Sequence, residues 1–184
     1  MLLENVASLE IFRPKMDATK KVLHAIAELE TDISPALPYL NAELGGWDYD
    51  ALNQVLLLKM SEGKWITLQP RQIAIRGCRD QEEARALAVW IKNQVNDIYA
   101  RRASITPRYT SQAGLKVMEI LKQLPMTNCK VCGYATCMAF AAALREGEIT
   151  PADCLPLKEE KFQEKRASLL EYLQSYGWRP LDEV

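Results

Sequence analysis

The residues of this sequence best suited to chemistry are four cysteines, Cys129, Cys132, Cys137 and Cys154. Their spacing is Cys-x2-Cys-x4-Cys-x16-Cys. Thiolates are the usual protein ligands of cubane iron–sulfur clusters, and each iron takes one of them, so four cysteines complete a [4Fe–4S] site. We therefore expect these residues to bind one [4Fe–4S] cluster that transfers single electrons.

Other metal sites fit the spacing less well. Structural zinc usually takes two Cys-x2-Cys-type pairs or Cys and His pairs, but here Cys137 and Cys154 are 17 positions apart and the sequence has one histidine, His24. A c-type haem needs a histidine directly after Cys-x2-Cys, where this sequence has Gly133. A structural zinc module and a set of buried thiols without metal stay open as alternatives.

The sequence around the cysteines predicts the elements that position them. Gly133 suits a tight loop with positive φ, and Thr136 suits the N-cap of a helix that begins at Cys137. Such a helix would place Cys137 on the same face as its apolar residues and direct free amides and the helix dipole toward the negatively charged cluster. Gly147 is expected to end the helix, and a short turn begun by Thr150-Pro151 would bring in Cys154.

We expect an α+β protein with two domains, residues 1–105 and 106–184, joined by an arginine-containing stretch at 101–109. In the first domain, we expect a helix over 18–30, a short helix from Ser34-Pro35 to Gly45-Gly46, a three-stranded sheet, and a long helix opened by Asp80 and Glu83. The expected strands are Val55–Leu58, Trp65–Leu68 and Ile73–Ile75. In the second domain, helices are expected over 111–124 and 158–176, on either side of the cysteine segment.

Composition limits the classes of function. The chain has 184 residues, of which 48% are hydrophobic, and its formal net charge is −1. This charge gives no electrostatic reason to expect binding to nucleic acid or to an anionic membrane. We expect no membrane span and a cytoplasmic location, because no apolar run approaches the ~18 residues of a span and the N-terminus lacks a secretory pattern.

The segment from Gly114 to Pro156 resembles a known module, the small [4Fe–4S] domain of the corrinoid iron–sulfur protein large subunit. A similar domain occurs in the B subunit of Rnf electron-transport complexes. The resemblance covers about a quarter of the chain and includes positions other than the cysteines: Leu124-Pro125, Asn128, Gly133, Thr136, Phe140-Ala141 and Gly147. It implies that Cys129, Cys132, Cys137 and Cys154 are the cluster ligands and that the module transfers single electrons.

The sequence also departs from that family. Leu155 separates Cys154 from Pro156, whereas the family often has Cys-Pro at the fourth ligand. The barrel and the corrinoid-binding domain of the large subunit are absent, and so is the cofactor's Asp-x-His-x-x-Gly signature. The resemblance therefore implies a cluster in this chain, and a corrinoid only on a partner protein.

The main hypothesis is an electron carrier whose N-terminal domain recognises a redox partner. The rival is an iron–sulfur sensor or regulator whose N-terminal domain binds protein or nucleic acid. No nucleophile, base and orienting group converge in the sequence, so we do not expect this chain alone to turn over a substrate. Cys78 and His24 are interpreted as ordinary structural residues, although two flanking arginines could make Cys78 reactive.

Overall fold

The structure is a computed structural model that describes residues 2–4, 6–14 and 22–180. The chain divides into two compact units, Met1–Tyr109 and Thr110–Val184. Together they contain helices and an antiparallel sheet, so the class is mixed α and β. Among the described residues, no helix combines the length and the apolar character that a bilayer crossing needs.

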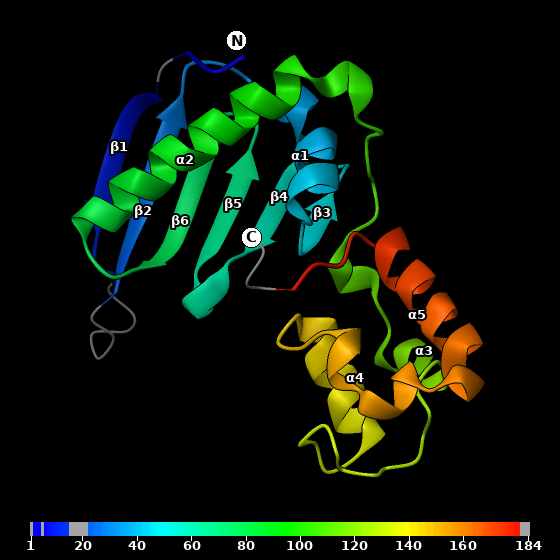
Figure 1. The fold of residues 1–184 in the computed structure, drawn as a ribbon. Helices are drawn as coiled ribbons and strands as arrows, with labels where there is room; N and C mark the ends of the chain where they lie inside the picture. Colours follow the sequence, from blue (N-terminus) through cyan, green and yellow to red (C-terminus); the bar gives the residue numbers. More distant parts are fainter. Residues whose placement is uncertain (1, 5, 15–21, 181–184) are drawn as a thin grey trace. The chain divides into compact units, whose positions relative to one another are not determined.

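The first unit is built on a six-stranded sheet with the order β1-β2-β6-β5-β4-β3, in which every neighbouring pair is antiparallel (Figure 1). The strands are β1 (Val6–Phe12), β2 (Leu23–Leu29), β3 (Asp48–Asp50), β4 (Val55–Lys59), β5 (Trp65–Gln69) and β6 (Gln72–Cys78). The prediction of three strands was wrong in number. It matches β4, β5 and β6, whereas β1, β2 and β3 were missed.

The predicted helix over 18–30 is wrong where the structure describes it, because Leu23–Leu29 is strand β2; residues 18–21 lie outside the described part. Ala25, Ala27 and Leu29 alternate with more exposed neighbours, as a half-buried strand requires. Alanine is the best helix former, so two alanines at the buried positions concealed this alternation. Pairing with β1 and β6 on both sides outweighs that local preference.

Two helices of the first unit, α1 (Leu37–Leu44) and α2 (Gln81–Ala100), cover the same face of the sheet (Figure 1). The residues of α2 that are buried recur at the 3.6-residue period of an amphipathic helix: Ala84, Ala88, Ile91, Val95 and Ile98.

The N-cap prediction for Asp80 is confirmed, since its carboxylate accepts a hydrogen bond from the Glu83 amide at 2.8 Å. The Glu83 carboxylate accepts from the Arg79 amide at 2.6 Å.

The second unit contains three α-helices, α3 (Val117–Lys122), α4 (Cys137–Glu146) and α5 (Gln163–Ser175). Both α3 and α5 are shorter than predicted. Single 3-10 turns occupy Gln112–Gly114 ahead of α3, and Leu155–Lys158 and Glu160–Phe162 ahead of α5. Glu159, between the two turns ahead of α5, has an extended backbone (φ −68°, ψ 145°), so no continuous helix runs from residue 158 to 176.

One apolar core holds the second unit together. Its buried members come from all three helices and from the turn that carries Cys154: Leu115, Ile120, Leu121, Leu124, Phe140, Ala141, Leu144, Cys154, Leu157, Leu169 and Leu173. The indole of Trp178 donates a hydrogen bond to the Leu144 carbonyl at 2.6 Å. This contact fixes the C-terminal end of α4 and leaves its N-terminal end for the cysteine segment.

Candidate metal centre

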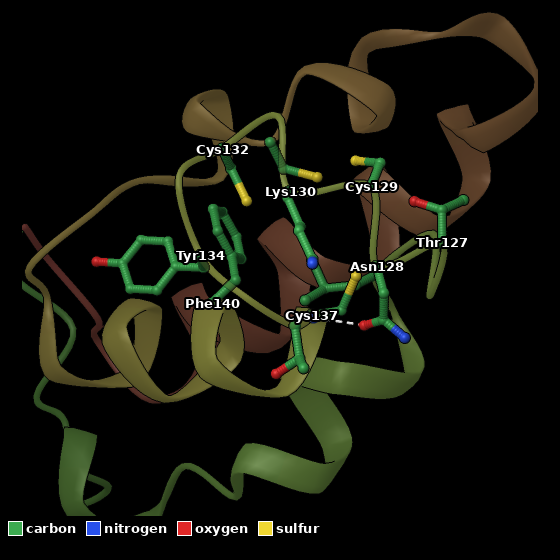
Figure 2. Close-up of a pocket in the computed structure, with 11 residues that line it drawn as sticks. Thr127, Asn128, Cys129, Lys130, Cys132, Tyr134, Cys137 and Phe140 are labelled. Atoms are coloured by element: carbon green, nitrogen blue, oxygen red, sulfur yellow. Dashed lines mark hydrogen bonds between the residues drawn. The ribbon is translucent and has the colours of Figure 1, made fainter.

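The start of α4 is held by two side-chain acceptors. The Thr136 hydroxyl accepts from the Ala139 amide at 3.1 Å, so the predicted N-cap is confirmed. The Asn128 carbonyl oxygen accepts from the Cys137 amide at 2.8 Å (Figure 2). Two of the first three amides of α4 are therefore engaged by these side chains, so the helix end offers fewer free N–H groups to an anionic cluster than we expected.

Asn128 is a site residue to which the sequence analysis gave no role. It lies directly before Cys129 in the loop and bonds to Cys137 nine positions later. Its φ of 47° is in the left-handed region, which asparagine tolerates better than most residues. An asparagine just before a ligand loop is a sequence signal for such a turn.

The loop has an unusual backbone. Besides Asn128, the non-glycine residues Met126 and Lys130 have positive φ values, 59° and 63°. Gly133 follows with a φ of 84°, as its sequence position predicted, and a Cβ there would meet no atom within 4 Å. Glycine is therefore needed at this position for the backbone angle and not for space. Left-handed conformations of non-glycine residues cost about 1–2 kcal/mol each, so other contacts must hold this loop in place.

The structure brings all four predicted cysteines to one pocket of the second unit. Cys129 and Cys132 come from the loop and Cys137 from the first turn of α4 (Figure 2). Cys154 comes from the turn after Pro151–Asp153. All four are free thiols; Cys129 is exposed, Cys132 and Cys137 are half-buried, and Cys154 is buried. The set thus combines sulfur donors at the surface with one in the core.

Two of these thiols have shifted pKa values. Hydrogen bonds from the Val131 amide and the Thr127 side chain lower the pKa of Cys129. Burial raises the pKa of Cys154, although a bond from the Leu157 amide opposes the shift. Charge on the other three cysteines raises it further, which reflects how close the four sulfurs lie. Binding to iron requires each of them as a thiolate.

The walls of the pocket are apolar toward the core. Leu124 and Phe140 line it, and Tyr134 packs edge-on against Phe140 with ring centroids 5.9 Å apart. The four cysteine thiols, together with the apolar side chains that line the same pocket, form a donor set that fits a [4Fe–4S] cluster. Within the described residues, no three or more His, Cys, Asp or Glu side chains are arranged to hold a single metal ion. A cubane cluster needs a different arrangement, because each of its four irons takes one thiolate.

Other residues considered in the sequence lie elsewhere. Cys78 is buried at the end of β6 in the first unit, and burial, as the main cause, raises its pKa, which fits the structural interpretation. His24 lies on β2, where its ring packs edge-on against Phe12 at 5.9 Å. In the stretch predicted as a linker, the Arg101 guanidinium pairs with Glu43 at 2.9 Å.

The comparisons with known proteins identify first the class of the cysteine segment. Residues 124–156 match the family described as "Putative Fe-S cluster", and this range contains all four cysteines. The cysteine segment of the second unit is therefore similar to an iron–sulfur family. No solved structure matches the chain.

Particular relatives match a part of the chain. One is acetyl-CoA decarbonylase/synthase complex subunit gamma of Methanocaldococcus jannaschii, 44% identical over 70 residues, which are 38% of this chain and 14% of the relative. Another is subunit gamma 2 of that complex from Methanosarcina thermophila, 53% identical over 53 residues, or 28% of this chain and 11% of the relative. An uncharacterised protein of Methanocaldococcus jannaschii is 43% identical over 61 residues, or 33% of this chain and 27% of that protein. The chain thus spans only a small part of the relatives' length.

Proposed function

We propose that Cys129, Cys132, Cys137 and Cys154 bind one [4Fe–4S] cluster and that the chain exchanges single electrons with a partner protein. The observation that carries the proposal is that four thiols from a loop, a helix and a turn line one pocket, within the segment that matches an iron–sulfur family. When bound, the cluster supplies a one-electron redox couple. The protein sets its potential through burial and through the amide and hydroxyl groups around the sulfurs.

The surface around the cysteines supports electron exchange with a protein. Four large apolar side chains are 41% to 58% exposed and flank the ligand positions: Met126, Val131, Met138 and Leu155. An exposed apolar rim beside an exposed ligand lets a partner approach closely and exclude water, as the cores of protein interfaces do. We propose that Cys129 and this rim face the redox partner.

The ligand assignment is tested by changing one cysteine at a time to serine. Cys129→Ser, Cys132→Ser and Cys137→Ser are expected to lose the visible absorbance of the cluster, because each removes one of four thiolates. Cys78→Ser, in the other unit, is the matched control and should keep it. Full iron and sulfide contents in all three ligand variants would contradict the assignment.

A partner that carries a corrinoid is our more specific proposal. It rests on the resemblance to the corrinoid iron–sulfur protein, and relatives named as subunits of a multi-subunit complex support a protein partner. One electron would pass from the reduced chain to the cobalt of the partner's corrinoid, from Co(II) to Co(I). Stopped-flow absorbance of a mixture of the reduced chain with a corrinoid protein should show this reduction. Val131→Asn, which makes the rim polar without adding charge beside the cluster, should slow it with little change in the midpoint potential. No reduction at any protein ratio would exclude this partner class while leaving the cluster itself in place.

The second candidate is an iron–sulfur sensor, which the exposure of Cys129 favours because oxidants can reach that edge of the site. In a sensor, loss of the cluster would change the binding of a protein or nucleic acid by the first unit. Reversible reduction without a change in binding favours the carrier; release of the cluster in air together with altered binding favours the sensor.

A further inference from the structure

Lys130 directly follows Cys129 and lines the same pocket as all four cysteines. Figure 2 shows its side chain directed into this pocket, toward Cys137. Apart from the cysteines, the other described residues that line the pocket have neutral side chains. Lys130 therefore brings a fixed positive charge to a pocket that otherwise holds only thiols and neutral groups.

The backbone keeps Lys130 at this position. Its Cα is about 3.8 Å from that of Cys129, and Cys132 follows two positions later. The φ of Lys130 is 63°, in the left-handed region, and its carbonyl accepts a hydrogen bond from the Gly133 amide at 3.0 Å. Because the proposed ligands Cys129 and Cys132 hold the chain on both sides, the ammonium stays beside the cluster in any rotamer.

No acid in the described part of the chain pairs with Lys130. The carboxylate whose charge acts on the Cys129 thiol is that of Glu159, which raises the pKa of this thiol against the larger effect of its hydrogen bonds. Glu159 itself pairs with Lys161 at 2.6 Å, so its negative charge is offset there. The positive charge of Lys130 is thus available to the sulfur ligands.

A cluster held by four thiolates is an anion, and its reduction adds one more negative charge. The start of α4 offers limited compensation, because Asn128 and Thr136 already accept hydrogen bonds from two of its first three amides. The pocket wall formed by Leu124 and Phe140 is apolar, so a nearby charge is screened less there than in water. A cation at this place therefore stabilises the reduced form more than the oxidised form.

We propose that Lys130 compensates the negative charge of the cluster and thereby raises its midpoint potential. This role rests on the proposed [4Fe–4S] centre and deepens it, because it names a side chain that favours the reduced form. One electron enters from the redox partner and no proton or atom is transferred, so the two forms differ by one unit of charge. Lys130 neither binds iron nor carries the electron; it acts through its own charge.

An EPR-monitored redox titration of the full chain, purified without oxygen, tests this role. Lys130→Met and Lys130→Gln remove the charge and should make the midpoint potential more negative, whereas Lys130→Arg should keep it close to the native value. None of these replacements is glycine or β-branched, so each carries a similar cost of the left-handed backbone. Added salt should reduce the difference between the native chain and Lys130→Met, because an exposed charge is screened. Lys116→Met removes an exposed lysine of the same unit that does not line the pocket, and it should leave the potential unchanged.

Two results would overturn the proposal. One is a cluster-loaded Lys130→Met with the native midpoint potential; a slower reaction with a redox partner alone would then assign Lys130 to docking. The other is the same shift in Lys130→Met and Lys130→Arg, which would show that side-chain shape acts and charge does not. Loss of the cluster in both neutral variants but not in Lys130→Arg would support charge compensation. A native chain without iron and sulfide would contradict the proposed function itself, and this role with it.

Discussion

At the scale of single residues, the centre depends on contacts that fix the sulfur positions as much as on the sulfurs. Asn128 takes a left-handed backbone conformation beside Cys129 and accepts the Cys137 amide at 2.8 Å. One side chain therefore links the loop that carries two cysteines to the helix that carries the third. The cysteines themselves could be predicted from spacing, but this link could not, because it depends on a contact between loop and helix that spacing does not encode.

Replacing Asn128 tests that link. Asn128→Ala should release the cluster several-fold faster in the presence of a chelator, because it removes the acceptor and puts alanine at positive φ, at about 1–2 kcal/mol. Asn128→Gly relieves the backbone but also lacks the acceptor, so a release rate between those of the native chain and Asn128→Ala separates the two effects. The rate is followed by visible absorbance. Equal rates in all three proteins would show that Asn128 positions nothing.

At the scale of elements, α4 carries a ligand at its first residue and the core at its later turns. Thr136 caps it, and Gly147 ends it in a left-handed conformation with a φ of 76°. Both ends were predicted, because caps depend on residues next to each other in the chain. Strand β2 was not predicted. Its alanines favour helix locally, and only its pairing with β1 and β6 determines the strand. Local sequence patterns thus predicted the helix ends around the cysteines reliably and the strands of the sheet less well.

The cap predicts a measurable loss of stability. Thr136→Ala should lower the free energy of unfolding of the second unit by about 1 kcal/mol, because the Ala139 amide loses its acceptor. Thr136→Ser keeps a hydroxyl and should recover most of the difference. Denaturant unfolding of the cluster-free chain, followed by circular dichroism, measures both. If alanine and serine had the same effect, the cap would not contribute.

At the scale of the whole molecule, the chain joins a unit built on a six-stranded sheet to a unit that carries the four cysteines. Two acetyl-CoA decarbonylase/synthase gamma subunits match 38% and 28% of this chain, which are 14% and 11% of their own length. The apolar rim near Cys129 supplies the proposed contact with a redox partner. The sequence could not predict the six-stranded sheet, because strand β2 pairs with β6, which lies far from it along the chain.

The central claim is the [4Fe–4S] centre, and its direct test is analysis of protein purified without oxygen. Iron and acid-labile sulfide per chain are measured together with EPR spectra before and after reduction by dithionite. We predict about four of each per chain, with no EPR signal in the oxidised form and a rhombic S = 1/2 signal after reduction, as four thiolates and one cubane require. One zinc per chain without sulfide would contradict the account and leave a structural module in place of a redox centre.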